Sequence, residues 1–170
     1  MNLNVTSKDH VKGLANAPIE IIEYADYQCP YCKKAYYILK ELPAELRHNI
    51  KLVFRNFPLQ ELHEHALNAA IAAEVAASQG KFWEMHDIIF ENQRYLSDRD
   101  LIEYAQKINL DVEKFEKEFG DDRFFEKVKS DYESGEHNGV EGTPTFFVNG
   151  KLFGGNWMTE EFTEYLQSLT

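Results

Sequence analysis

The first part of the chain places two short apolar runs on either side of an amphipathic segment. After Pro18, the sequence IEIIEYAD is short, apolar and partly β-branched, which predicts a buried strand. Residues 32–42 carry apolar side chains on one helical stripe, and Pro43 should end or kink that helix. The run IKLVFRNFP, from Ile50, predicts a second strand. Strand, helix and strand in this order form a βαβ unit, which implies a parallel strand pair.

From residue 61 to residue 133 the pattern changes to helical periodicity. The sequence HALNAAIAAEVAAS is rich in alanine and strongly helix-prone. Ser97 is followed three residues later by Asp100, an arrangement close to a capping box at a helix start. A later stretch, DDRFFEKVKSDYESG, ends at Gly135, which suits a helix C-terminus. We expect roughly four or five helices in this block.

The last part of the chain returns to strands. In TFFVNGKLFGG, two short apolar stretches are joined by Asn149 and Gly150, a pair that favours a type I′ hairpin turn. Thr159 is then a candidate N-cap for a final amphipathic helix. The expected order is therefore βαβ, a helical block and ββα, which is an α/β fold.

Composition limits the classes of partner. The chain has 170 residues, 44% of them hydrophobic, which is enough for one core or for a small domain with a large insertion. Its net charge of -11 argues against binding to nucleic acid or to an anionic membrane surface. No apolar run approaches the length of a membrane span.

The two cysteines are the strongest chemical signal. Cys29 and Cys32 are the only cysteines, and a bridge between them would close too short a loop to stabilise the fold much. Cys29 should be the N-cap of the helix, with Pro30 in its first turn, so that the free amides and the helix dipole lower the thiol pKa. Cys32 lies close enough to attack a mixed disulfide on Cys29. The spacing predicts thiol–disulfide exchange.

Other side chains near the pair leave alternatives open. Glu23 is expected to be at least partly buried and could accept the proton of Cys32, or it could reach solvent or a lysine. The pair could instead be half of a zinc site, since His63, His65 and His86 occur later in the chain. Without a second cysteine pair, we expect no metal. A partly exposed helix start is the favoured role of His63 and His65, and packing within a helix that of His86.

Four segments together resemble the DsbA-like branch of the thioredoxin superfamily: EYADYQCPYC, FRNFPL, QGKFWEMHDIIFENQ and GVEGTPTFFVNGKLFGG. The resemblance extends from about His10 to Trp157. It implies a thioredoxin-like fold with an inserted α-helical domain. In this division, residues 1–60 and 138–170 form the thioredoxin-like domain and residues 61–137 the helical insertion.

The resemblance also implies a set of site residues. Pro144 is expected to be cis and to face the cysteines, and the backbone of Thr143 is expected to pair with an extended substrate, together with Pro30 and Tyr31. Glu23 matches the buried acid of DsbA-like members. Tyr31 stands where the periplasmic oxidant has histidine, which implies a weaker oxidant.

The predicted activity is thiol–disulfide oxidoreduction of protein substrates, with no cofactor beyond the Cys29–Cys32 disulfide. The alternatives are a glutaredoxin-like, glutathione-dependent reductase, a disulfide isomerase, or a non-enzymatic module. A redox partner protein or glutathione is the expected electron partner, and the chain is expected to be a monomer. Since it starts with Met and lacks a secretory signal, a cytoplasmic location is expected, or a periplasmic one if a signal was removed.

Overall fold

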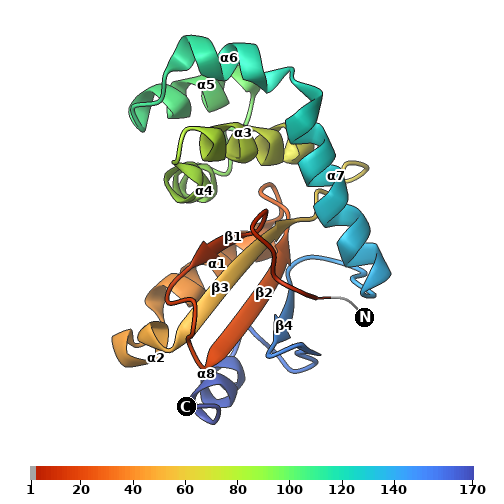
Figure 1. The fold of residues 1–170 in the computed structure, drawn as a ribbon. Coiled ribbons are helices and arrows are strands. Elements are labelled where there is room, and N and C mark those ends of the chain that lie inside the picture. Colours follow the sequence, from red (N-terminus) through yellow and green to blue (C-terminus); the bar gives the residue numbers. More distant parts are fainter. Residues whose placement is uncertain (1–2) are drawn as a thin grey trace.

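A five-stranded sheet forms the centre of the computed structural model, which describes residues 3–170. The strands lie in the order β1-β3-β2-β4-β5 (Figure 1). Their bounds are His10–Lys12 for β1, Ile19–Ala25 for β2, Ile50–Asn56 for β3, Thr145–Val148 for β4 and Lys151–Leu152 for β5. The helices are α1 (Pro30–Glu41), α2 (Ala44–His48), α3 (Ala66–Ser78), α4 (Phe82–Glu91), α5 (Asp98–Lys107), α6 (Val112–Phe119), α7 (Asp122–His137) and α8 (Glu160–Gln167).

The predicted βαβ unit is confirmed. Strands β2 and β3 pair in parallel, from Ile19 beside Ile50 to Ala25 beside Asn56, and α1 and α2 connect them. The β4–β5 hairpin is also confirmed, with φ of 48° at Asn149 and 77° at Gly150. These positive values are the backbone conformation that a type I′ turn requires. The α/β, thioredoxin-like architecture with inserted helices is therefore present.

The sheet has a hydrophobic cluster on each face. On one face, Ile19 and Ile21 of β2 pack with residues of α1, α2 and α8. On the other, Ile22 and Tyr24 pack with Phe57 and with residues near α7. Alternate residues of β2 thus point to opposite faces and are buried on both, as its apolar sequence indicates. None of the helices in residues 3–170 is both long and apolar enough to cross a membrane.

The five helices α3 to α7 lie between β3 and β4 in the sequence. In Figure 1, α3 to α6 gather beyond one end of the sheet, while α7 runs down beside it. The largest hydrophobic cluster joins these helices to Tyr27, Cys29 and Cys32. The helical block and the cysteine segment therefore share one core. The division into domains at residues 61 and 138 stays a prediction.

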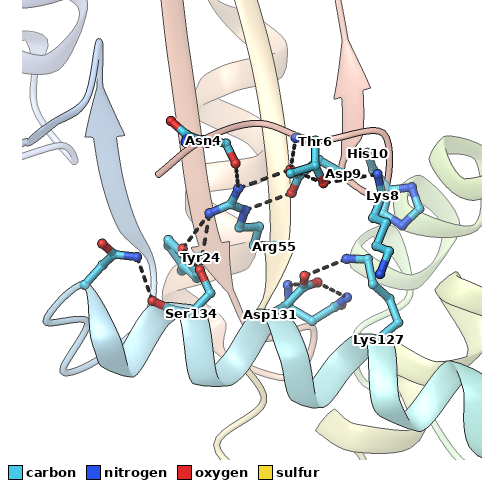
Figure 2. A network of polar contacts seen from close by, with 12 residues as sticks. Asn4, Thr6, Lys8, Asp9, His10, Tyr24, Arg55, Lys127, Asp131 and Ser134 are labelled. Carbon is cyan, nitrogen blue, oxygen red and sulfur yellow. Dashed lines mark hydrogen bonds and ion pairs between the residues drawn. The ribbon is translucent and has the colours of Figure 1, made fainter. Parts of the chain in front are cut away.

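A polar network fixes α7 to the sheet (Figure 2). Arg55 of β3 donates to both carboxylate oxygens of Asp9, at 2.8 and 3.1 Å, and to the hydroxyl of Tyr24 at 2.9 Å. The Tyr24 hydroxyl also shares a hydrogen bond of 2.8 Å with Ser134 of α7. These contacts connect the N-terminal segment, two strands and the helix, so each element restrains the others.

Three features of the fold differ from the sequence predictions or were not foreseen. Helix α7 does not end at Gly135 but continues to His137. A Cβ added at Gly135 would lie 2.6 Å from the ring of Phe57. The glycine therefore permits close packing at this position and does not end the helix. Strand β1 and helix α2 were not predicted, since each is too short for a periodic pattern.

Candidate active site

Cys29 lies at the amino end of α1, at the carboxyl edge of the sheet. It is the N-cap residue, with extended backbone angles of -71° and 122°, and Pro30 begins the helix. Proline lacks an amide hydrogen, so at the first helical position it adds no unsatisfied donor. The amides of the next residues remain directed toward the sulfur. The predicted position of Cys29 is therefore confirmed, and the two cysteines are free thiols in this structure.

The environment of Cys29 lowers the pKa of its thiol from 9.0 to about 6. The hydrogen bond from the Cys32 thiol has the largest effect, and the Thr143 hydroxyl and the backbone amides of Cys32 and Tyr31 add to it. Burial acts in the opposite direction. A thiol with this pKa is mostly thiolate at neutral pH, which is the nucleophilic form.

Cys32 has the opposite ionisation. It lies in the first turn of α1 and is 0% exposed. Burial raises the pKa of the Cys32 thiol well above its ordinary value, and the neighbouring Cys29 sulfur raises it further. The Cys32 Sγ accepts a hydrogen bond of 3.4 Å from the Asp26 amide. The pair therefore combines a reactive thiolate with a second thiol that holds its proton.

Thr143 and Pro144 lie opposite the cysteines. Strand β4 pairs with β2 so that Thr145 is beside Tyr24, which brings the preceding residues to the carboxyl end of β2. The Thr143–Pro144 bond is cis, as the family resemblance implies. The Cys29 thiol donates to the Thr143 carbonyl at 3.6 Å. Within the described residues, the buried Thr143 hydroxyl has no hydrogen-bond partner in this dithiol form, so it is free to donate to a thiolate.

Two loops from outside α1 hold the cysteine segment. The side-chain amide of Gln93 donates to the carbonyls of Tyr27, at 2.9 Å, and Cys29, at 2.8 Å. The His65 amide donates to the side chain of Gln28 at 2.8 Å. The sequence analysis missed Gln93, because no local pattern connects it to residues more than sixty positions earlier. These bonds fix the backbone that carries the nucleophile.

Asp26 is a second support that the sequence analysis did not assign. It is 1% exposed, and its carboxylate accepts from the amides of Gln28 at 2.7 Å and Leu59 at 2.8 Å. The His63 ring also bonds it, at 2.8 Å from Nδ1. His63 thus has a partner at the site and is not simply part of a helix start, whereas His65 is the N-cap of α3. The separation of 37 residues explains why the pairing was not predicted.

Glu23 is buried, as predicted, but it is not bonded to the cysteines. It is 2% exposed, its Oε1 has no hydrogen-bond partner among residues 3–170, and burial raises the pKa of its carboxyl to about 8. The bonds of the Cys32 sulfur run to Asp26 and Cys29 instead. A carboxyl that titrates near neutral pH has the right acidity for proton exchange with a thiol. Its role in the reaction remains a prediction.

The remaining predicted residues divide between surface and core. Pro30 and Tyr31 are exposed beside Cys29, Tyr31 by 53%, so a substrate can reach them. His86 is a packed helix residue, as predicted: it is 4% exposed, and the Tyr27 hydroxyl bonds its Nδ1 at 3.1 Å. Among residues 3–170, no three His, Cys, Asp or Glu side chains gather as metal ligands would.

Curated relatives match this chain as one part of longer proteins. An Na(+)/H(+) antiporter, NhaA 3 of Salinispora tropica, is 39% identical over 161 residues, covering 95% of this chain and 24% of the relative. An NhaA antiporter of Herminiimonas arsenicoxydans is 35% identical over 160 residues, covering 94% of this chain and 25% of the relative. The chain therefore spans about a quarter of the length of these relatives.

Three solved structures share the fold. A thioredoxin-like oxidoreductase from Silicibacter pomeroyi has a TM-score of 0.83 at 24% identity and covers 96% of this chain and 92% of its own. The thiol-disulfide exchange protein alpha-DsbA2 of Wolbachia pipientis has a TM-score of 0.81 at 21% identity, covering 96% and 88%. BdbD of Bacillus subtilis has a TM-score of 0.81 at 22% identity, covering 95% and 92%.

The family model described as thioredoxin matches residues 5–168, which is nearly the whole chain. The match includes the cysteine pair, the inserted helices and the cis-proline loop that the structure brings together. The chain therefore belongs to the thioredoxin family and has the DsbA-like form of its fold, with helices inserted between the two halves of the sheet.

Proposed function

We propose that this protein is a thiol–disulfide oxidoreductase that acts on protein thiols and disulfides. The observation that carries the proposal is the opposite ionisation of two adjacent thiols: a pKa of about 6 at Cys29 and a raised pKa at Cys32. A structural disulfide or a buried pair would not require this difference, whereas a nucleophile and a resolving thiol do. Electrons pass between sulfur atoms, so the reaction needs no bound cofactor.

The reductive reaction has two displacements. The Cys29 thiolate attacks a substrate disulfide, which forms a mixed disulfide and releases one substrate thiolate. Cys32 then loses its proton and attacks the Cys29 sulfur, which forms the Cys29–Cys32 disulfide and releases the second substrate thiolate. Glu23 is the proposed acceptor of that proton. Its pKa of about 8 is close enough to neutral pH for both its carboxylate and its carboxyl form to be populated. Oxidation of a substrate dithiol runs the same steps in reverse.

Substrate binding is assigned to the surface around Cys29. Thr143 comes shortly before β4 in the sequence. Its carbonyl oxygen lies 3.6 Å from the Cys29 sulfur. An extended peptide could pair with it by strand addition, which places a peptide cysteine next to the thiolate. Pro144, Pro30 and the exposed Tyr31 would contact the neighbouring side chains of the peptide.

The test is trapping of the mixed disulfide. Cys32→Ser removes the resolving thiol, so attack of Cys29 on the disulfides of oxidised client proteins should accumulate a covalent adduct that dithiothreitol releases. Cys29→Ser is the matched control, since it keeps the other thiol and should give no adduct. The wild type should reduce insulin disulfides with dithiothreitol as electron source. Absence of both the adduct and insulin reduction would refute the proposed function.

The choice of substrate distinguishes glutathione-dependent reduction from exchange with protein disulfides. Fast turnover of a small glutathione mixed disulfide, together with no activity on insulin, would identify a glutaredoxin-like reductase. Refolding of a scrambled multi-disulfide protein tests isomerase activity. The antiport named for the curated relatives concerns proteins about four times as long as this chain, and no feature of the site supports extending it here.

A further inference from the structure

A cavity of about 380 Å³ lies away from Cys29, between α1, α2 and α4 over the β3 side of the sheet. Its walls are largely apolar: Leu39, Leu42, Ile50, Leu52 and Trp83 all line it. Trp83 is held in place because its ring nitrogen donates to the Val11 carbonyl at 3.2 Å. Pockets of about 300–1,000 Å³ with apolar walls and a few polar groups are typical small-molecule sites.

The buried end of this cavity has an unsatisfied polar group. Glu23 lines it, is 2% exposed, and has no hydrogen-bond partner for Oε1 among residues 3–170. Leaving a buried polar atom without a partner costs free energy, and a ligand hydroxyl or amine at this point would remove that cost. The cavity thus offers one specific hydrogen bond at its inner end.

The exposed charged residues that line the cavity are basic. Lys12 and Arg47 are exposed there, and neither forms an ion pair in the described part of the chain. Lys12 Nζ lies 5.4 Å from the centre of the Trp83 ring, beside the apolar wall. His48 is a further exposed basic group in the lining. In a chain of net charge -11, the charges of Lys12 and Arg47 at one pocket favour an anionic ligand.

Two other ionisable residues of the lining, Lys40 and Asp87, do not reverse this field. Lys40 is paired with Glu91 at 2.9 Å, so its charge is largely satisfied. Asp87 is half-buried, and burial raises the pKa of its carboxyl. The unpaired charges available to a ligand are therefore those of Lys12 and Arg47.

We propose that this cavity binds a small amphipathic carboxylate, with its anionic group at Lys12 and Arg47 and its apolar body against Leu52 and Trp83. A hydroxyl at the far end of the ligand would bond Glu23. This site is distinct from the surface that meets protein substrates, although it shares Glu23 with the proposed redox reaction, and ligand binding does not require that reaction to occur.

Binding is measured with three probes of one length: octanoate, octanol and octylammonium. The chain has two tryptophans, so Trp157→Phe leaves Trp83 as the only indole, and its fluorescence reports on the cavity. Octanoate should give a saturable change, and octylammonium should bind about tenfold more weakly or worse. The ω-hydroxy derivative of octanoate should bind about threefold tighter than octanoate, because of the added bond to Glu23.

Variants of exposed residues then locate the site. Lys12→Glu and Arg47→Glu should each weaken octanoate binding about tenfold. Ala44→Phe, at an exposed position in the lining, should weaken all three probes by obstruction. Arg99→Glu is the control, since Arg99 is 88% exposed on α5 outside the lining, and octanoate binding should not change.

Thermal unfolding of each variant shows whether it is folded. If a charge-reversal variant is unfolded, octanoate binding to Ala44→Phe still tests whether the cavity is the binding site. Failure of octanoate to saturate would overturn the proposal. The proposal would also be overturned by a second result. In that result the three probes bind with equal affinity, and octanoate binding is unchanged in Ala44→Phe and in the folded charge-reversal variants. This combination indicates general hydrophobic adsorption.

Discussion

The ionisation of Cys29 depends most on a single donor, the thiol of Cys32, and this can be tested with a matched pair of variants. Cys32→Ala removes the donor, whereas Cys32→Ser replaces it with a hydroxyl of similar size that still donates. Each variant has one cysteine, because the chain has two in all. Any thiolate signal from either variant therefore belongs to Cys29.

The size of the effect follows from the structure. The pKa of Cys29 falls from 9.0 to about 6, which is a difference of 3 units with the Cys32 thiol as the largest favourable contribution. A hydrogen bond to a charged group contributes about 1.5–3 kcal/mol, and one pKa unit corresponds to about 1.4 kcal/mol. Cys32→Ala should therefore raise the pKa of Cys29 by about 1–2 units. At neutral pH its ionised fraction should fall from about nine tenths to between about one half and one tenth.

The assay is thiolate absorbance in the ultraviolet as a function of pH, with the rate of alkylation by iodoacetamide as a second measurement. Cys32→Ser should titrate close to the wild type, and Cys32→Ala clearly above it. Identical titration of the two variants would show that the donor at position 32 is not the main cause. If both variants titrated like a free cysteine, the N-cap amides and the Thr143 hydroxyl would also have no effect, and the account of the site would fail.

Three further predictions concern buried ionisable groups. Burial raises the pKa of Glu23 from 4.5 to about 8, so the wild type should lose stability as pH rises through this range; Glu23→Gln should be the more stable protein at its upper end, by at most about 5 kcal/mol in urea unfolding. An equal gain at the acid end would contradict this. Burial lowers the pKa of His86 from 6.5 to about 3, so stability should fall as pH drops below 6.5, and His86→Gln should show a flatter acid unfolding curve by circular dichroism. Asp9→Asn leaves Arg55 without its carboxylate at a contact where both side chains are 6% exposed; denaturant unfolding should show a loss of about 3 kcal/mol, and a loss below about 1 kcal/mol would mean that water replaces the partner.

What the sequence could predict was local. The βαβ unit, the Asn149–Gly150 turn and the capping box at Ser97 follow from residues within a few positions of one another, and the structure confirms them. Gly135 was misinterpreted because the reason for it is a contact with Phe57, which lies far away in the sequence. A glycine that permits close packing and one that ends a helix look the same in a sequence.

The same limit applies to the site. The position of Cys29 at a helix N-cap could be predicted, because strand, cysteine and proline follow one another. The residues that hold the Cys29 segment could not be predicted. Gln93 and His63 come from loops far along the chain, and they bind backbone carbonyls and a carboxylate, groups that carry no specific sequence signal. Burial of Glu23 could be inferred from its apolar neighbours, but not the absence of a partner for its Oε1 among the described residues.

The inserted helices share a hydrophobic core with the cysteine motif. Two thiols three positions apart share the dipole of one helix, so the dipole by itself would favour ionisation of both. Burial separates them, because it is the first cause of the raised pKa of Cys32. The hydrophobic cluster that buries Cys32 also contains Met85 and Phe90 of α4, together with residues of α3 and α5. The resolving thiol therefore holds its proton within a core that α1 shares with the helical block, so substitutions that loosen this core are expected to reduce the difference in pKa between the two thiols.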